Sequence, residues 1–135
     1  MLTNRSMPQS VIIPEIPYPD VLEAADWLCS NFGFSVRLRI GNHRVQLKFN
    51  QGDLVITGPS PMPVPRHSIM VRLSNIDHHY AQTVLKGVKI VNPPADHPYG
   101  EKQYTALDLA GHHWTFSQTV MDVDPAEWGG SETKE

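Results

Sequence analysis

Basic and amide side chains recur at every second position in two neighbouring stretches of the chain. Arg37 and Arg39 fall in the first stretch, and Arg44, Gln46 and Lys48 fall in the second. Side chains two residues apart on a strand lie on the same face, so all five are predicted on one polar side. Such groups hydrogen-bond carboxylates and carbonyl oxygens. They would either bind an anionic or carbonyl-bearing ligand or form the solvated face of an antiparallel sheet.

Seven histidines could bind a metal or transfer protons, but their spacing does not group them. His112 and His113 are adjacent, so on a strand they point to opposite faces. His67 opens a predicted strand, where it would either line a ligand site or hydrogen-bond a neighbour as a strand-end residue. The remaining four are expected in exposed turns, loops or the first turn of a helix: His43, His78, His79 and His97.

Three aromatic residues lie near each other late in the chain. Tyr104, Trp114 and Phe116 would either form an aromatic wall for a ligand or pack between a sheet and a helix. The single cysteine, Cys29, falls on the apolar face of a predicted helix, so its thiol is expected to be buried and inert. No Gly-rich phosphate loop or acid–base pair is identifiable, and the catalytic residues are unknown.

A helix is predicted in the first half of the chain. Asp20 can cap it, Glu23 completes a capping box three residues later, and Gly33 supplies the stop. Apolar residues recur at helical spacing on one face: Val21, Leu22, Ala25, Leu28, Cys29 and Phe32.

Strands flank this helix, because the apolar period changes to two after Gly33. The predicted strands of the first half cover residues 11–13, 35–40, 44–49 and 54–57. The run 59–66 then contains four prolines, which can neither donate to a sheet ladder nor continue a helix. We interpret it as a stiff linker.

The second half repeats this order of elements. A strand at residues 67–73 precedes a helix that begins at Asp77 and ends at Gly87, with its apolar face formed by Tyr80, Ala81, Val84 and Leu85. Further strands are predicted at residues 88–91, 103–107 and 113–118. Aligning Asp20 with Asp77 superposes the halves element for element, which indicates an internal repeat.

The predicted fold is therefore α+β, with two tandem βαβββ modules. The expected parts of the chain are a flexible N-terminus (1–10), a first module (11–58), a Pro-rich linker (59–66), a second module (67–120) and an acidic C-terminal tail (121–135).

Composition excludes several classes of protein. With 40% hydrophobic and 19% charged residues among 135, the chain is too apolar to be disordered. Its net charge of −3 argues against nucleic acid as a partner. No apolar stretch is long enough to span a membrane, and no signal peptide is recognisable. A single cysteine forms no internal disulfide, so a cytoplasmic location is expected.

Several segments between Val11 and Gln118 resemble the glyoxalase/bleomycin-resistance branch of the vicinal oxygen chelate superfamily. They are Tyr18-Pro19-Asp20, Ala24–Leu28, Phe32-Gly33-Phe34, Pro98-Tyr99-Gly100, Tyr104-Thr105-Ala106, and Asp108 with Gly111–Trp114. The resemblance implies that the two modules form a curled mixed sheet with a cup-shaped cleft for a ligand, and that the helix of each module lies on the outer face. It also implies a small-molecule ligand and a homodimer.

Metal-using members of this superfamily bind one divalent ion through His, Gln or Glu side chains from both modules, and the ion acts as a Lewis acid. The resemblance places His67 at one ligand position. Thr115 stands where the family has a glutamate, Gln46 where relatives often have one, and Ser10 or Val11 at the remaining position. A neutral hydroxyl is a poor ligand for transition metals. We expect no metal cofactor, with a divalent ion as the alternative.

Three functions remain open. The first is a dimeric protein that binds a small molecule without metal, through the ligand-binding residues His67, Gln46, Arg37, Arg39, Tyr104, Trp114 and Thr115. The second is an enzyme, either a metal-dependent lyase or dioxygenase with a degenerate site around His67, or a metal-free isomerase. The third is an interaction module with an exposed apolar surface. The sequence does not decide the ligand, the reaction or whether the dimer exchanges modules.

Overall fold

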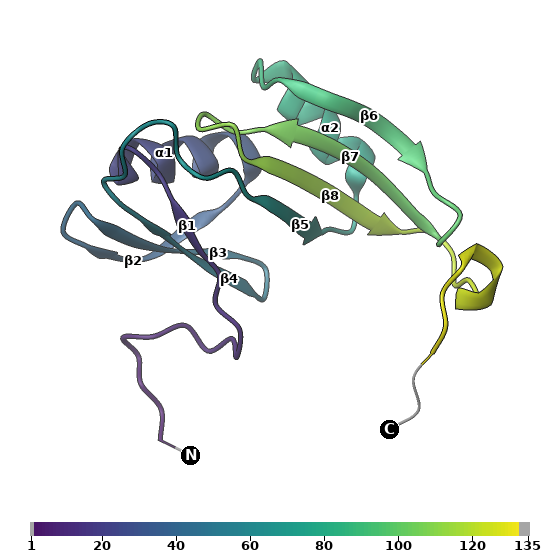
Figure 1. The fold of residues 1–135 in the computed structure, drawn as a ribbon, viewed down its shortest axis with the longest axis horizontal. Helices are drawn as coiled ribbons and strands as arrows, with labels where there is room; N and C mark the ends of the chain where they lie inside the picture. Colours follow the sequence, from purple (N-terminus) through teal and green to yellow (C-terminus); the bar gives the residue numbers. More distant parts are fainter. Residues whose placement is uncertain (1, 133–135) are drawn as a thin grey trace. The chain divides into compact units, whose positions relative to one another are not determined.

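The strands of this chain form two separate four-stranded sheets, each with one α-helix (Figure 1). The structure is a computed structural model that describes residues 2–132. The chain divides into two units between His67 and Ser68, and each unit has the element order β-α-β-β-β. This confirms the predicted α+β fold of two tandem modules. Neither sheet is closed into a barrel.

The first unit contains β1 (Glu15–Pro17), α1 (Val21–Phe32), β2 (Ser35–Ile40), β3 (Arg44–Phe49) and β4 (Gly52–Thr57). Its strand order is β1-β4-β3-β2, with β1 parallel to β4 and the other pairs antiparallel. Val45 pairs with Ile56 and Leu47 with Leu54, so these four side chains share one face. They are buried with the apolar face of α1.

Both ends of α1 follow the sequence signals. The Asp20 carboxylate accepts a hydrogen bond from the Glu23 amide at 3.0 Å, and Gly33 ends the helix with φ of 89°. The buried residues are spaced three or four apart: Val21, Ala24, Ala25, Leu28 and Phe32. Leu22 lies about 100° around the helix from Val21 and is partly exposed. Ala24 occupies the buried position on the apolar face that was predicted for Leu22.

The predicted strand at Val11–Ile13 is wrong. The first strand is β1, and its ladder with β4 begins where Glu15 lies opposite Val55. This register buries Ile16 against Ile56, whereas Val11 lies before the ladder and is 98% exposed. The apolar run at residues 11–13 therefore did not locate the first strand, because a residue in this part of the chain is buried only where it pairs with β4.

The second unit contains β5 (Ser68–Arg72), α2 (Ile76–Leu85), β6 (Ile90–Asp96), β7 (Glu101–Leu107) and β8 (His113–Thr119). Its order, β5-β8-β7-β6, is equivalent to that of the first unit, with β5 parallel to β8. The outermost strand, β6, carries Pro93 and Pro94 and has register shifts in its pairing with β7.

The apolar face predicted for the second helix is partly wrong. The Asn75 side chain accepts from the His78 amide, so α2 begins at Ile76, one residue earlier than predicted. The face toward the sheet consists of positions three, four and seven residues after the first: Ile76, His79, Tyr80 and Thr83. Leu85 lies off this face and is 79% exposed. The prediction that His79 is solvated is also wrong, because its ring stacks on Phe116 with centroids 4.3 Å apart.

A turn centred on Asp108 joins β7 to β8. The Asp108 carboxylate accepts hydrogen bonds from the Ala110 and His112 amides at 2.9 and 3.0 Å, and from Trp114 Nε1 at 3.0 Å. Asp108, His112 and Trp114 are all buried. These hydrogen bonds therefore anchor the turn to the buried core of the second unit.

The chain after β8 folds back on the β6–β7 connection. A short 3-10 helix, η1 (Pro125–Trp128), places Trp128 against Tyr99 with ring centroids 5.2 Å apart. Residues 133–135 of the predicted acidic tail lie outside the described residues. Within the described part, neither helix has the length and hydrophobicity needed to cross a membrane.

Candidate functional site

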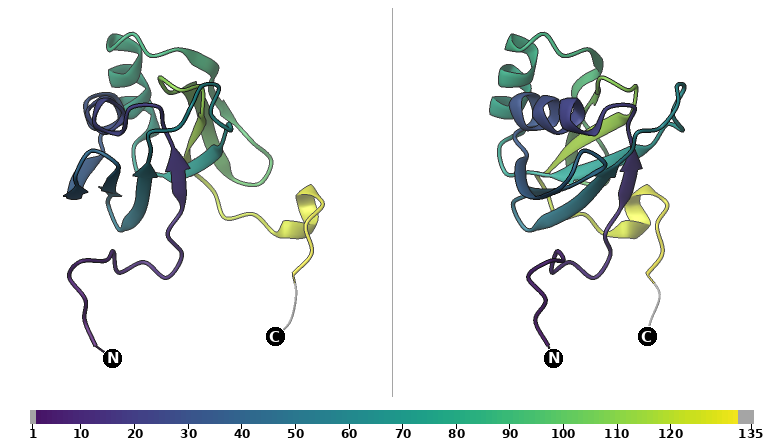
Figure 2. Two further views of the ribbon diagram at one scale, coloured as in Figure 1. Left: turned by 60° about the vertical axis from the view of Figure 1, so that its left-hand side comes forward. Right: turned by 90° about the vertical axis from the view of Figure 1, so that its left-hand side faces the viewer.

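Each sheet has a second face, turned away from its helix, that carries most of the polar side chains of its strands. On the first sheet the cross-strand register places Arg44, Gln46 and Lys48 opposite Thr57, Val55 and Asp53. We call this side the polar face of the first sheet. Figure 2 shows it facing the N-terminal segment, on the side opposite α1.

Arg37 and Gln46 are brought together on this face. One guanidinium nitrogen of Arg37 donates to Gln46 Oε1, and the other donates to the main-chain oxygen of Arg5 at 2.9 Å. Gln46 Nε2 donates to the main-chain oxygen of Ser6 at 2.9 Å. Arg37 and Gln46 were expected to donate hydrogen bonds to carbonyl oxygens. In the structure these carbonyl oxygens belong to the N-terminal segment of the same chain.

Arg39 does not join them, which corrects the prediction that all the basic residues share one face. The pairing of β2 with β3 shifts between Val36 and Leu38, so Arg39 lies opposite the buried Val45. Its guanidinium is 3.7 Å from the carboxylate of Asp26, on α1. One extra residue at the bulge therefore moves Arg39 to the helix side of the sheet.

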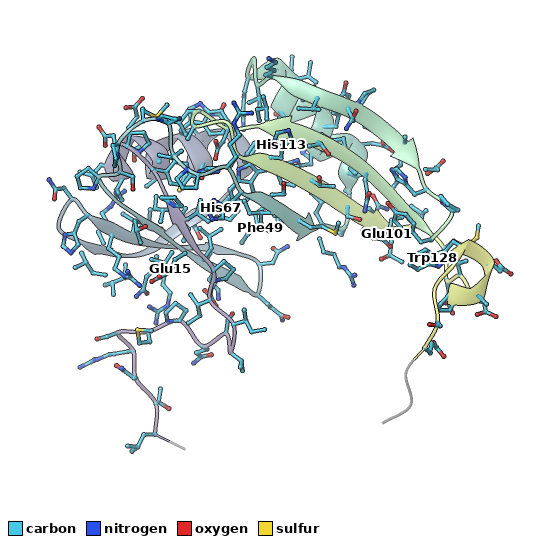
Figure 3. The ribbon with its side chains drawn as sticks, in the orientation of Figure 1. Glu15, Phe49, His67, Glu101, His113 and Trp128 are labelled. Atoms are coloured by element: carbon cyan, nitrogen blue, oxygen red, sulfur yellow. The ribbon has the colours of Figure 1, made fainter. Side chains whose placement is uncertain are left out.

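The other two basic residues of the cluster are ion-paired. Arg44 pairs with Glu15, which the sticks in Figure 3 show on β1, and Lys48 Nζ lies 3.5 Å from Asp53. The carboxylates balance these charges, so the face as a whole is not strongly positive. Arg37 instead hydrogen-bonds to neutral amide and carbonyl oxygens.

The polar face of the second sheet carries a chain of hydrogen-bonded side chains. Tyr99 Oη donates to Gln103 Oε1 at 2.9 Å, and Gln103 Nε2 donates to Ser117 Oγ at 3.0 Å. Ser117 Oγ in turn donates to Glu101 Oε1 at 2.6 Å. Glu101 lies at the start of β7, at the end of the unit near Trp128 (Figure 3). These bonds fix the orientation of four polar groups along one side of β7.

Electrostatics keep the Glu101 carboxyl ionised. Hydrogen bonds from Ser117 and Thr119 lower the pKa of Glu101 below its ordinary value of 4.5, and the charge of Arg72 lowers it further. Arg72 lies opposite Ser117 in the β5–β8 register. The negatively charged Glu101 carboxylate therefore lies at this end of the face, near the positively charged Arg72.

Thr115 lies further along the same face. Its hydroxyl is 2.8 Å from that of Thr105 on β7, and Met70 on β5 lies opposite it. Met70 is 65% exposed, and both threonines are partly exposed. The face thus offers partly exposed hydroxyl groups beside an exposed apolar side chain, whereas Gln103 and Ser117 on the same face are buried.

Tyr104 and Trp114 belong to the core of the second unit, so the prediction that they line a ligand site is corrected. Tyr104 pairs with Phe116 and Ala106 with Trp114, so these side chains share one face of the sheet, the face that packs on α2. Both Tyr104 and Trp114 are buried there. The Tyr104 hydroxyl contacts His79 Nδ1 and Thr83 Oγ1. Burial raises the pKa of Tyr104 to about 12, so the hydroxyl stays protonated at neutral pH.

His67 ends the first unit, one residue before β5. Its Nδ1 donates to the Pro65 main-chain oxygen at 3.0 Å, as expected for a strand-end histidine that bonds a neighbour. Cys29 is half-buried, and burial raises the pKa of its thiol, which lowers its reactivity at neutral pH.

The residues at the expected metal-ligand positions do not fit a divalent ion. Gln46 Oε1 accepts from the cationic Arg37, whose charge would repel a metal, and the Thr115 hydroxyl is paired with Thr105. Among residues 2–132, no group of three or more His, Cys, Asp or Glu side chains is placed to hold a metal ion.

Sequence reasoning missed the hydrogen-bonded side chains of the second sheet. The signal was present, because Glu101, Gln103 and Thr105 alternate with Lys102, Tyr104 and Ala106. The same rule of period two that grouped the basic residues of the first half would have placed these three side chains on one face.

Comparison with known proteins identifies the family. The profile of the Glyoxalase/Bleomycin resistance protein/Dioxygenase superfamily matches residues 11–116. The chain belongs to this superfamily. The match covers most of both units and agrees with the order of elements in each. A search of curated protein sequences gave no significant match.

Several solved structures are similar to this chain. TioX from Micromonospora sp. ML1 is 31% identical with a TM-score of 0.73, and the match covers 82% of this chain and 99% of TioX. TnmS3, an antibiotic binding protein from Streptomyces sp. CB03234, is 22% identical with a TM-score of 0.70, covering 84% and 98%. The bleomycin resistance determinant encoded on the transposon Tn5 is 19% identical with a TM-score of 0.69, covering 84% and 100%.

Proposed function

We propose that this protein binds a small organic molecule on the polar face of its second sheet, without a metal ion. The observation that carries the proposal is the combination of oriented polar groups with an exposed apolar side chain. Thr105 and Thr115 supply partly exposed hydroxyl groups, and Met70 supplies an adaptable apolar contact. Small-molecule sites use this combination of apolar contact and a few placed polar groups.

The comparisons support the proposal. TnmS3 is described as an antibiotic binding protein, and the Tn5 protein as a bleomycin resistance determinant. A protein that binds a toxic compound requires no catalytic group. We therefore favour binding over catalysis, and an antibiotic-like organic molecule as the ligand.

The location and assembly follow from the sequence and the family resemblance. We infer a cytoplasmic protein, because its single cysteine is suited to a reducing compartment. We also infer a homodimer, since the resemblance implies that subunits pair.

Amide NMR of the full chain tests where a ligand binds. We would add metal-free bleomycin, and then a panel of aromatic antibiotics, at millimolar concentration. We expect a binding compound to shift the resonances of residues 103–105 and 115–117. Thr115→Val should lower the affinity for that compound by about fivefold, which corresponds to the loss of one hydrogen bond. The same change at Thr57 on the first sheet should leave the affinity unchanged.

Two outcomes would contradict the proposal. A bound compound that leaves residues 103–105 and 115–117 unshifted would place the site elsewhere, and failure of the whole panel would favour an interaction module. The metal-free part is tested by adding EDTA and then Zn²⁺ or Ni²⁺. Stoichiometric metal that is lost in His67→Ala would show that the protein uses an ion.

A further inference from the structure

The second sheet is unevenly exposed on the face turned away from α2. Thr105 and Thr115, which lie opposite each other on β7 and β8, are partly exposed. Two residues further along, Gln103 is 9% exposed and Ser117 is 1% exposed, although the register places them on the same face. Side chains on an open face of a sheet are buried only where other groups lie over them. One end of this face is therefore covered.

Tyr99 reaches over the covered end. It belongs to the turn between β6 and β7, and its Oη donates to Gln103 Oε1 at 2.9 Å. Gln103 Nε2 donates in turn to Ser117 Oγ, whose single hydrogen is used on Glu101. The two buried polar groups are thus already hydrogen-bonded within the protein. While Tyr99 stays in place, neither is available to a molecule bound on the face.

Two aromatic neighbours hold the Tyr99 ring. His97 stacks on it with centroids 5.2 Å apart and planes inclined at 15°. Trp128, on η1, approaches it with centroids also 5.2 Å apart and planes inclined at 57°. Figure 3 shows Trp128 at the end of the unit that carries Glu101. His97 is in the same turn as Tyr99, so Trp128 is the neighbour that a distant segment supplies.

The segment that carries Trp128 is seated on this turn. The amides of Val120 and Met121 donate to the Gly100 main-chain oxygen at 2.9 and 3.3 Å. Gly100 has φ of 86°, and a Cβ there would lie 2.2 Å from the Met121 oxygen, so glycine is needed for this close approach. Further along, no residue of η1 is buried, and Trp128 itself is 45% exposed. The contact with Tyr99 is therefore important for holding η1 in place.

The segment after β8 lies outside the part of the chain that matches the superfamily. The profile match ends at residue 116, within β8. The contact of Trp128 with Tyr99 therefore does not follow from membership of the superfamily, and is a property of this chain.

We propose that Tyr99 and Trp128 form an aromatic lid that limits the length of the small-molecule site on the second sheet. With the lid in place, a bound molecule reaches the two threonine hydroxyls and no further. Without Trp128, the Tyr99 ring is free to leave Gln103, and a longer polar molecule gains the Gln103 amide and the Ser117 hydroxyl. Trp128 is thus a positioning residue that acts through Tyr99. The effect on a ligand rests on the function proposed above, whereas the lid itself does not.

Solvent relaxation measured by NMR tests the lid without a ligand. The nitroxide TEMPOL relaxes the protons that it approaches, and it has the size of a small organic molecule. In the wild type it should relax the side-chain amide of Gln103 weakly. Trp128→Ala should increase that relaxation by about fivefold, within the range expected for loss of one aromatic pair. Trp128→Phe, which keeps a ring against Tyr99, should restore the wild-type value. The methyl groups of Thr105 and Thr115 should change little.

Two further variants are controls. Trp27→Ala removes a comparable aromatic contact from the first unit, where Trp27 and Phe32 have centroids 5.1 Å apart, and should leave Gln103 unchanged. Arg72→Ala removes the other side chain placed to shield Ser117, which it faces across the β5–β8 pair. It should leave the relaxation of Gln103 near the wild-type value. Circular dichroism would confirm that every variant is folded.

Equal relaxation of Gln103 in the wild type and in Trp128→Ala would overturn the proposal. So would an increase in Trp128→Phe as large as that in Trp128→Ala, or an increase in Arg72→Ala alone. Failure of the proposed function would be seen separately, as the absence of binding across the antibiotic panel, and would leave the TEMPOL result unaffected.

Discussion

Arg37 and Arg39 show how far a single residue depends on its neighbours in space. They are two positions apart and would share a face on a regular strand, but the bulge between Val36 and Leu38 separates them. The bulge is defined by the pairing of β2 with β3, which the residues of β2 alone do not specify. Alternation could therefore predict the Arg37–Gln46 pair but not the contact of Arg39 with Asp26.

The titration of Glu101 is a prediction at the same scale. Its pKa lies below 4.5 in the folded protein, so its contribution to stability is present above that pH and is lost as pH falls through the lowered value. Removing the strongest donor in Ser117→Ala should raise the pKa of Glu101 toward 4.5. NMR titration of the side-chain carboxyl measures both values. An unchanged midpoint in Ser117→Ala would show that the Ser117 hydroxyl does not stabilise the carboxylate.

Elements were predicted best where local chemistry decides them. The capping residue and the glycine stop of α1 act within a few residues. A period of two in the sequence located the strands β2, β3, β7 and β8, although the bulge interrupts it in β2. The strand at Val11–Ile13 and the apolar face of α2 failed, because both depend on pairing or packing across the fold. The polar face of the second sheet was within reach of the sequence, whereas the hydrogen bond of the N-terminal segment to the first depends on residues 40 positions apart.

The turn between β7 and β8 supports a prediction about stability. Asp108 is buried and accepts three hydrogen bonds, two from turn amides and one from Trp114. Asp108→Ala leaves these donors without their acceptor, and should lower the free energy of unfolding by about 3 kcal/mol. Urea denaturation measures this loss. Asp122→Ala, after the last strand and exposed, is the control and should cost less than about 0.5 kcal/mol.

At the scale of the whole molecule, the internal repeat made the fold predictable. Each half alone gives a short series of weak signals, but the same order of elements twice in 135 residues restricts the architecture strongly. The repeat does not extend to function. Equivalent faces carry different side chains, and N-terminal residues hydrogen-bond to the first.

Assembly gives a prediction for the molecule as a whole. If the protein is a homodimer, light scattering coupled to size-exclusion chromatography should give twice the chain mass of 15.2 kDa. The mass should not change on reduction, because the half-buried Cys29 forms no intramolecular disulfide and is not expected to link subunits. A monomer mass across micromolar concentrations would contradict the inferred dimer.

The two adjacent prolines of β6 affect how readily this protein aggregates at high concentration. A strand at the border of a sheet exposes amide and carbonyl groups that can recruit a foreign strand and begin aggregation. The amides of adjacent residues in a strand point to opposite sides, so one of Pro93 and Pro94 removes a donor from that border, and the irregular register there distorts it further. The opposite border, β5, contains no proline. Strand addition to the second sheet is therefore disfavoured at β6, which leaves β5 as the border where another chain could pair.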